Sequence, residues 1–261
     1  SQINLSPDFI ECIVFWTKNA VPFMDYLEEL NRMGYMYMFQ YTITPYDNTL
    51  EKNISDKSDI IKNVLELSEK IEKKRIVWRY DPILLNDTYT VNRHIELFEE
   101  MCSLLYTAVN HVVISFIDLY QKNRGYRLYE LSTDEITHLA QAFGEIGAKY
   151  KLPIKTCCEN YDLTKFGITK GACIDSVLLE EICNRPLLLK KATGQRKNCL
   201  CAESVDIGDY HTCLNGCIYC YATDYKRLKT KQKCYDKNSQ ILCDKLDFGK
   251  DIIKVRKMKK L

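Results

Sequence analysis

The sequence predicts an α/β protein whose strands are parallel. Short runs rich in β-branched and aromatic residues alternate, over the first two thirds of the chain, with longer amphipathic stretches that have helical spacing. The short runs are apolar on both faces, as expected for parallel strands whose sheet is covered by helices. Five such strand–helix units form either a doubly wound sheet or a barrel, and the residue pattern alone favours neither.

The predicted elements alternate from the N-terminus onward. Strands are expected at residues 11–17, 36–44, 75–83, 111–120 and 152–159, and helices at residues 21–34, 55–73, 91–109 and 132–150. Ser55 and Ser132 are the expected N-caps, and Glu135 occupies the capping-box position relative to Ser132. Gly34 is expected directly after the first helix, where a left-handed backbone ends many helices.

The chain changes character near residue 193, where the periodicity fades and cysteines become frequent. We therefore predict a strand–helix domain over residues 1–192 and a cysteine-rich segment with a basic tail over residues 193–261. The tail from Lys226 to Leu261 has 13 basic and 4 acidic side chains, a net charge of +9, whereas the whole chain carries +2. It could contact phosphate groups, but no aromatic residues alternate with its charges, so a solvated terminus is favoured. Neither a membrane-spanning stretch nor a signal peptide is evident, and a cytoplasmic protein without a membrane partner is expected.

Polar side chains stand where the predicted strands end. Because the carboxyl ends of parallel strands form the working face of such folds, we predict a polar binding site there. Its candidate residues are Lys18, Gln40, Arg79, Asp81 and Glu159. Arg79 and Asp81 fall on one face of their strand and could instead form a simple ion pair.

Thirteen cysteines are many for a chain of 261 residues. The odd number and the missing secretory signal argue against a disulfide framework. Cys12, Cys102 and Cys183 lie in apolar patterns and are expected to be small buried hydrophobic residues. The remaining cysteines begin at Cys157, and their clustering indicates metal binding.

The strongest motif is Cys213-x3-Cys217-x2-Cys220, in which Asn215-Gly216 favours a loop. One candidate centre is zinc, with His211, Cys199 or Cys201 as its fourth ligand. The other is a [4Fe–4S] cluster with one iron left open to a small ligand. The spacing is not that of the usual zinc knuckle and favours the cluster, and Tyr219 suits an aromatic residue beside a bound cofactor.

A second metal centre is a further expectation. Three or four cysteines of the group Cys157, Cys158, Cys173, Cys199 and Cys201 could form an auxiliary iron–sulfur cluster or a zinc site, or one of them could lend a ligand to the first centre. The candidate ligands are Cys158, Cys173, Cys199 and Cys201. Adjacent Cys157 and Cys158 should point to opposite faces of a strand, so at most one of them faces a given site. Unliganded thiols are the favoured interpretation of this group.

The segment Cys213-x3-Cys217-x-Tyr219-Cys220 resembles the cluster motif of the radical S-adenosylmethionine (SAM) superfamily. The wider chain resembles a family described as domain of unknown function 1848 through the segments FWTKNA, FQYTITPY, WRYDPI, CCENYDL, GACID and CLCAESVDIGDYHTCLNGCIYCYA. The resemblance implies a partial TIM-type (βα) barrel and a [4Fe–4S] cluster whose fourth iron binds SAM through its amino and carboxylate groups. It also implies that reductive cleavage of SAM yields a 5′-deoxyadenosyl radical, which abstracts hydrogen from a substrate that the sequence does not identify.

The chain departs from that pattern in two respects. The cysteine loop follows all the predicted strands instead of the first one, so the tail is expected to fold back over the barrel mouth. Five strands are predicted where such partial barrels have six, and the additional N-terminal strand typical of the family is missing.

The resemblance assigns expected partners and roles. Arg79 would meet the carboxylate of SAM and Asp81 its ribose hydroxyls, and a reductant such as flavodoxin or ferredoxin would supply the electron. No catalytic residue is nominated. Two other functions remain open: a zinc-stabilised nucleic-acid-binding protein, and an iron–sulfur electron-transfer protein that does not cleave SAM.

Overall fold

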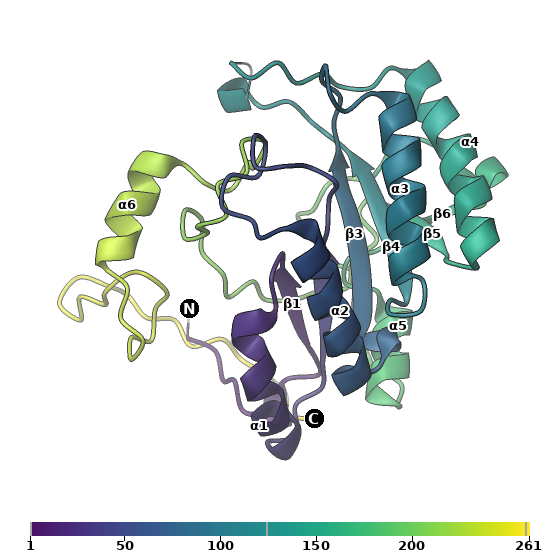
Figure 1. Cartoon of the computed structure of the whole chain (residues 1–261). Helices are drawn as coiled ribbons and strands as arrows, with labels where there is room; N and C mark the ends of the chain where they lie inside the picture. The colour runs from purple at the N-terminus through teal and green to yellow at the C-terminus, as the bar shows by residue number, and fades with distance from the viewer. Residues whose placement is uncertain (1, 124, 259) are drawn as a thin grey trace. The chain divides into compact units, whose positions relative to one another are not determined.

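The computed structural model describes residues 2–123, 125–258 and 260–261 (Figure 1). It divides the chain into two compact units. The sheet unit comprises Glu11–Pro45 and Ser55–Ser204. The cysteine-loop unit comprises Ser1–Ile10, Tyr46–Ile54 and Val205–Leu261.

The sheet unit contains a parallel sheet of six strands that follow one another in sequence order. The strands are β1 (Ile13–Thr17), β2 (Tyr37–Thr42), β3 (Ile76–Ile83), β4 (His111–Phe116), β5 (Ile154–Cys157) and β6 (Ile168–Gly171). The α/β class with parallel strands is confirmed. The sheet is not closed into a barrel: among the described strands, β1 pairs only with β2 and β6 only with β5.

The prediction of five strands was wrong by one. The sixth strand, β6, has the sequence ITKG, and both of its central residues are exposed. Such a strand has no apolar run and no alternation to signal it, and it is recognised only by its pairing with β5. It lies C-terminal to the five predicted strands and pairs at the far side of β5.

Helices follow most of the strands. They are α1 (Leu27–Arg32), α2 (Lys57–Ile71), α3 (Val91–Leu105), α4 (Thr133–Tyr150) and α5 (Ser176–Cys183) in the sheet unit, and α6 (Tyr225–Lys233) in the cysteine-loop unit. The capping box of Ser132 and Glu135 is confirmed, as is the left-handed Gly34 after α1. The N-cap of α2 is Asp56 instead of the predicted Ser55, and the first half of the predicted helix 21–34 is a 3-10 helix.

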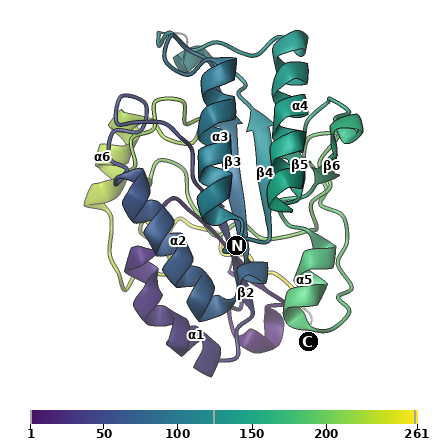
Figure 2. The same cartoon turned by 45° about the vertical axis from the view of Figure 1, so that its right-hand side comes forward.

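One face of the sheet is covered by α3 and α4, which lie in front of β3 and β4 in Figure 2. The ring of Trp78 stacks on Phe98 of α3 with a centroid distance of 5.5 Å, and Tyr80 meets Phe143 of α4 at 5.8 Å. These four aromatic side chains are fully buried. Their contacts explain why β3 carries an aromatic residue at alternate positions.

The opposite face carries a second core, against α5. Met38 of β2, Val77 of β3 and Val113 of β4 pack with leucines and an isoleucine of that helix. Because side chains alternate along a strand, the residues two positions further on, Gln40 and Arg79, lie on the same face nearer the carboxyl ends. The apolar half of this face therefore gives way to a polar half.

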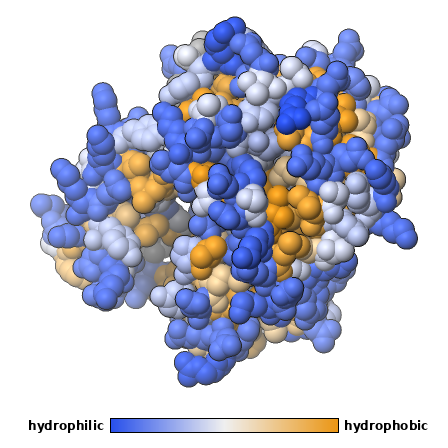
Figure 3. Space-filling model, in the orientation of Figure 1, coloured by the Kyte–Doolittle hydropathy of each residue, from blue (hydrophilic) through white to orange (hydrophobic). Residues whose placement is uncertain are grey.

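The cysteine-loop unit has little regular structure beyond α6 and a short 3-10 helix, Pro7–Phe9. Over the part of the chain that the structure describes, no helix combines the length and the hydropathy needed to cross a membrane. Figure 3 shows mostly hydrophilic residues on the face presented there, with separate, small hydrophobic areas between them.

Candidate functional site

The polar half of the inner sheet face is centred on Arg79, a buried side chain of β3. Its guanidinium forms an ion pair with Asp81, and its Nη1 lies 3.5 Å from Oε1 of Gln40. The indole ring of Trp16 covers the guanidinium, 4.8 Å from the ring centroid to Cζ. Burial disfavours the charged form, but Asp81 and nearby thiols outweigh it and raise the pKa of Arg79. The side chain is therefore a fixed positive charge.

Asp81 has a further hydrogen-bond partner on the neighbouring strand. The hydroxyl of Ser115, on β4, donates a hydrogen bond to its Oδ1. Burial alone would raise the pKa of the carboxyl group, but Arg79, Ser115 and Lys18 together lower it. The interpretation as an ion pair on one strand face is thus confirmed in geometry, while the SAM-binding roles of Arg79 and Asp81 stay predictions.

The other predicted rim residues also lie in the sheet unit. Lys18 follows β1 and its Nζ lies 3.5 Å from Oγ1 of Thr44. Gln40 donates from Nε2 to the carbonyl of Cys173 over 2.6 Å and is almost fully buried. Glu159 accepts a hydrogen bond of 2.9 Å from the backbone N–H of Phe116. Burial raises the pKa of Glu159 to about 7.

Cysteines gather beside Arg79 at the carboxyl ends of β5 and β6. Cys157 is the last residue of β5, and its Sγ lies 2.7 Å from Sγ of Cys173, which follows β6. Sγ of Cys173 also accepts from Nη1 of Arg79 at 3.1 Å. The backbone N–H of Cys173 donates to Sγ of Cys201 over 3.3 Å. Three sulfur atoms from three chain segments therefore meet at one place.

This environment changes the acidity of the thiols. Hydrogen bonds from Cys173, supplemented by backbone N–H groups of the same loop, lower the pKa of Cys201 to about 5. A hydrogen bond from Cys173 and the charge of Arg79 lower the pKa of Cys157 against the effect of burial. Cys158 lies just beyond β5 with a φ of 58°, so strict strand alternation does not govern the direction of its side chain.

The cysteine-loop unit contains the motif Cys213-x3-Cys217-x2-Cys220. The loop is tied by its backbone to the segment 46–54. The N–H of Ile218 donates to the carbonyl of Leu50 over 2.9 Å, and the N–H of Asn53 donates to the carbonyl of Asn215 over 3.1 Å. Gly216 has a φ of +70°, and a Cβ there would lie 3.1 Å from Nδ2 of Asn53. The loop conformation therefore favours glycine at this position.

Tyr219 is a residue of the loop, and its side chain is buried. Its hydroxyl donates to Oε1 of Glu51, and its ring meets Tyr46 edge-on at a centroid distance of 5.6 Å. Burial and the charge of Glu51 raise the pKa of Tyr219 well above its ordinary value. The side chain predicted to lie beside a cofactor thus anchors the loop to the segment 46–54.

The three motif cysteines differ in exposure: Cys213 is exposed, whereas Cys217 and Cys220 are half-buried. Nδ1 of His211, the zinc ligand considered in the alternative interpretation, accepts from the backbone N–H of Asp224 over 2.9 Å. Cys201, another candidate fourth ligand, lies against Cys173 in the sheet unit. Within the described ranges no group of three or more histidine, cysteine, aspartate or glutamate side chains is already arranged as a metal cage.

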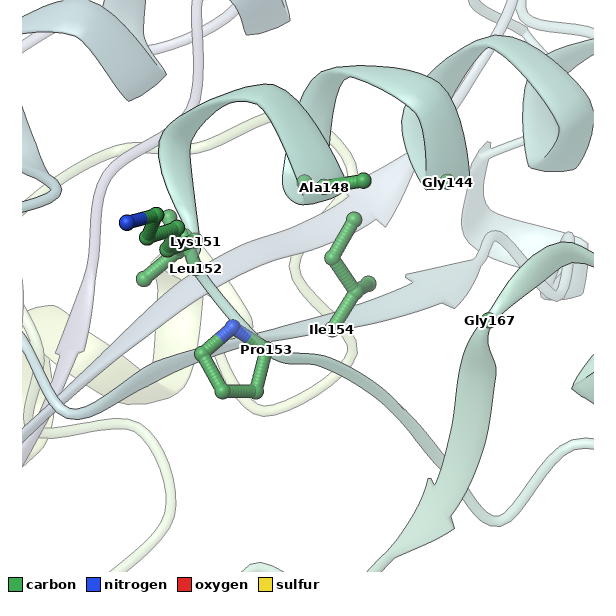
Figure 4. Close-up of a pocket in the computed structure, with 8 residues that line it drawn as sticks. Gly144, Ala148, Lys151, Leu152, Pro153, Ile154 and Gly167 are labelled. Carbon is green, nitrogen blue, oxygen red and sulfur yellow. The ribbon is translucent and has the colours of Figure 1, made fainter.

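A shallow pocket of about 260 Å³ lies elsewhere in the sheet unit, between the C-terminal part of α4 and the start of β5 (Figure 4). It is lined by Gly144, Ala148, Pro153, Ile154 and neighbouring residues, and Lys151 is the only lining residue with a titratable side chain. Such a lining supplies shape but no set of reacting groups. The chemistry-bearing residues lie instead at the carboxyl ends of the strands.

These features define an α/β protein with an open parallel sheet, a buried polar and thiol layer, and a separate cysteine loop. The chain matches the family described as "Domain of unknown function (DUF1848)" over residues 1–222, and it therefore belongs to this family. The match ends two residues after Cys220, so it includes the cysteine loop and leaves out α6 and the basic tail. No curated protein and no solved structure matches the chain.

Sequence reasoning missed the segment 46–54 and the role of Cys157. Glu51 is almost fully buried and accepts from Tyr219, which nothing in the sequence YDNTLEKN indicates. Strand alternation allowed only one of the adjacent residues Cys157 and Cys158 to face a given site, and Cys158 was the one named among the candidate ligands. The end of β5 at Cys157 is the signal that would have separated the two residues.

Proposed function

We propose that this protein is a radical SAM-type enzyme whose cysteine loop binds a [4Fe–4S] cluster through Cys213, Cys217 and Cys220. The observation that carries the proposal is the loop itself. It presents three thiols within eight residues, turns at a left-handed Gly216, and is anchored by the hydrogen bond from Tyr219 to Glu51. Three thiolates leave one iron of a cube without a protein ligand.

The fold supports the same proposal. Six parallel strands in sequence order, with α3 and α4 on one face and a polar layer on the other, are expected of a partial TIM-type (βα) barrel. In such folds the carboxyl ends of the strands form the working face. Gln40, Arg79 and Asp81 lie at that end of β2 and β3.

The residues of the loop fit the cluster by their chemistry. All three cysteines are free thiols, and thiolates are the ligands that iron–sulfur clusters take. The thiols are not yet arranged as a metal cage among the described residues, so the proposal requires their side chains to turn inward when the cluster assembles. Cys213, the exposed member of the three, has the freedom to do so.

When bound, such a cluster supplies an electron to the sulfonium of SAM, with a flavodoxin- or ferredoxin-type protein as the proposed reductant. The residues of the chain hold and shield the cluster. The hydrogen bond from Tyr219 to Glu51 fixes the loop to the segment 46–54, and the ring of Tyr46 packs beside Tyr219. The contribution of Lys18, Gln40, Arg79, Asp81 and Glu159 to SAM binding is part of the proposal.

The test is anaerobic reconstitution of the full chain with iron and sulfide, followed by incubation with SAM and a strong reductant. We expect about four irons per chain bound at the loop and release of 5′-deoxyadenosine. The triple variant Cys213→Ala/Cys217→Ala/Cys220→Ala should lose both. Cys234→Ala, a half-buried cysteine of the same unit outside the motif, is the matched control and should retain both.

Other outcomes would replace the proposal. A colourless protein that holds zinc at the loop and binds DNA or RNA in a salt-dependent manner would identify the nucleic-acid-binding alternative. A cluster that forms and exchanges electrons but releases no 5′-deoxyadenosine would identify electron transfer without SAM cleavage.

A further inference from the structure

Four cysteines of the sheet unit form a second group that the proposed function does not use. Cys157 ends β5, Cys173 follows β6, and Cys199 and Cys201 come from the segment after α5. Three separate stretches of chain therefore deliver these thiols to the same sheet edge. Such convergence from distant positions is a feature of built sites and is not produced by neighbouring residues in one loop.

The sulfur atoms form a continuous series. Sγ of Cys157 and Sγ of Cys173 are 2.7 Å apart. The thiol of Cys173 also lies within hydrogen-bonding reach of Sγ of Cys201, and that sulfur is in turn within reach of the thiol of Cys199.

Backbone hydrogen bonds hold the segments that carry these cysteines. The N–H of Ala202 donates to the carbonyl of Ile174 over 2.9 Å, and the N–H of Ala192 donates to the carbonyl of Cys201 over 2.9 Å. A Cβ at Gly171 would lie 2.7 Å from Cβ of Lys155, so glycine lets β6 approach β5 beside Cys157. The positions of the thiols are thus set by backbone pairing.

Two hydrogen-bond donors point at sulfur atoms of this group. Sγ of Cys173 accepts from the guanidinium of Arg79 at 3.1 Å, and Sγ of Cys201 accepts from the backbone N–H of Cys173 at 3.3 Å. Hydrogen bonds of this type to ligand sulfurs are the outer-shell contacts that stabilise thiolate–metal centres. Arg79 adds one positive charge next to a group that would be strongly negative.

We propose that Cys157, Cys173, Cys199 and Cys201 form a binding site for a single tetrahedral Zn²⁺ ion, separate from the cysteine loop. A set of four thiolates is a donor set typical of structural zinc. In a tetrahedron with Zn–S bonds of about 2.3 Å, neighbouring sulfurs are about 3.7 Å apart. The 2.7 Å between Cys157 and Cys173 means that these two thiols separate by about 1 Å on binding.

The same distance argues against an iron–sulfur cube at this place. Each cysteine of a cube binds a different iron, so the ligand sulfurs stand much farther apart than in a mononuclear site. The 2.7 Å between Sγ of Cys157 and Sγ of Cys173 is far shorter than the separation of two cluster ligands. The thiols are not yet arranged as a metal cage among the described residues, so a mononuclear ion requires their side chains to turn toward one centre.

The test uses the full chain carrying Cys213→Ala/Cys217→Ala/Cys220→Ala, which removes the ligands of the cysteine loop. Reduced, metal-free protein is titrated with Zn²⁺ against a chromophoric chelator, and with Co²⁺ to record the thiolate charge-transfer and tetrahedral d–d bands. We expect about one Zn²⁺ per chain and a tetrahedral Co²⁺ spectrum.

The ligands are then tested one at a time. Cys157→Ser, Cys199→Ser and Cys201→Ser should each weaken Zn²⁺ binding by more than about 100-fold, because even loss of an outer-shell partner costs 10–100-fold. Cys158→Ser, a substitution next to Cys157, is the matched control. It should bind Zn²⁺ as tightly as the parent, which is the chain that carries only the three loop substitutions. Cys201 and Cys199 are only half-buried, so their variants should fold even if a variant of buried Cys173 does not.

Three results would overturn the proposal. One is the absence of Zn²⁺ binding in the reduced parent chain. Another is unchanged affinity in Cys201→Ser or a loss in Cys158→Ser. The third is binding of about four irons with sulfide by the parent on reconstitution, which would assign the thiols to a cube. Because the loop cysteines are absent from the parent, none of these outcomes depends on radical SAM activity.

Discussion

The two cysteine-rich regions of this protein are built in different ways. In the sheet unit, Cys157 and Cys173 stand at the ends of adjacent paired strands and their sulfurs are in contact. In the cysteine-loop unit, Cys213, Cys217 and Cys220 lie on one irregular loop, and in neither unit do the described residues already form a metal cage. Strand pairing fixes the first group, whereas a loop leaves the second group free to adjust. The comparison indicates a preorganised thiol group in one unit and a motif that assembles around its ligand in the other.

The largest expected effect tests whether Arg79 holds the preorganised group together. Arg79→Met should reduce the free energy of unfolding by about 3–5 kcal/mol, because it leaves the carboxylate of Asp81 buried without its charge partner. Urea denaturation of both proteins at pH 7 measures this. Lys149→Met, which removes an exposed ion pair with Glu99, is the control and should change the free energy of unfolding far less than Arg79→Met. Equal losses in the two variants would mean that Arg79 is not a structural centre of the sheet unit.

The second prediction compares the thiols of the two regions directly. In the reduced, metal-free protein, exposed Cys213 should react with iodoacetamide at least about 100-fold faster than buried Cys173, because access limits the reaction. Peptide mapping by mass spectrometry over a time course gives both rates. In denaturant the two thiols should react at similar rates. Similar rates in the folded protein would show that the sheet unit does not shield its thiols.

A smaller effect concerns the pH dependence of the sheet unit. Burial raises the pKa of Glu159 from 4.5 to about 7, so the folded protein holds this proton more tightly than the unfolded chain. Stability is therefore greatest below pH 4.5 with respect to this group and is lost as the pH rises through 7. After allowance for solvent screening, the loss between pH 5 and pH 8 should be about 1–2 kcal/mol.

Glu159→Gln should remove that part of the pH dependence, as measured by urea denaturation at pH 5 and pH 8. Glu69→Gln, on the exposed side of α2, should leave the pH dependence of stability as it is in the unsubstituted protein. A Glu159→Gln variant with the parental pH dependence would contradict the raised pKa.

The smallest expected effect probes how closely the cysteine loop is fitted to the segment 46–54. Gly216 and Gly34 both have a positive φ, but only at Gly216 would a Cβ meet neighbouring atoms, 3.1 Å from Nδ2 of Asn53. Gly216→Ala should therefore cost roughly 1 kcal/mol more than Gly34→Ala in the free energy of unfolding. It should also lower the iron bound on reconstitution, which Gly34→Ala should not. Identical behaviour of the two variants would mean that the loop is not held in this conformation.

Much of the fold could be predicted because its signals are local. The strands β1 to β5 lie in runs rich in β-branched and aromatic residues, the helices α2 to α4 are long, periodic segments, and Ser132 with Glu135 forms the predicted capping box. The misses were short or depended on distant partners. The strand β6 has four residues of which two are exposed, and it is stabilised by pairing with β5. The helix α6 is so rich in lysine that its sequence resembles a solvated tail.

The candidate sites show the same division. The polar strand ends were predicted, and the structure brings Gln40, Arg79 and Asp81 together because β2 and β3 are adjacent parallel strands and these residues lie near their carboxyl ends. The partners Ser115, Cys157 and Glu51 were not predicted, since each is brought to its site by a strand or segment far away in the sequence.

The sequence by itself determined the class of fold, the alternation of strands and helices, the polar ends of the strands and the spacing of the loop cysteines. All of these depend on residues within a few positions of one another. The tertiary structure decided which cysteines meet, that Arg79 lies between a carboxylate and a thiol, and that Tyr219 rests on Glu51. Such contacts join residues separated by up to 168 positions, and only the packing of the folded chain selects them from the many that the sequence would allow.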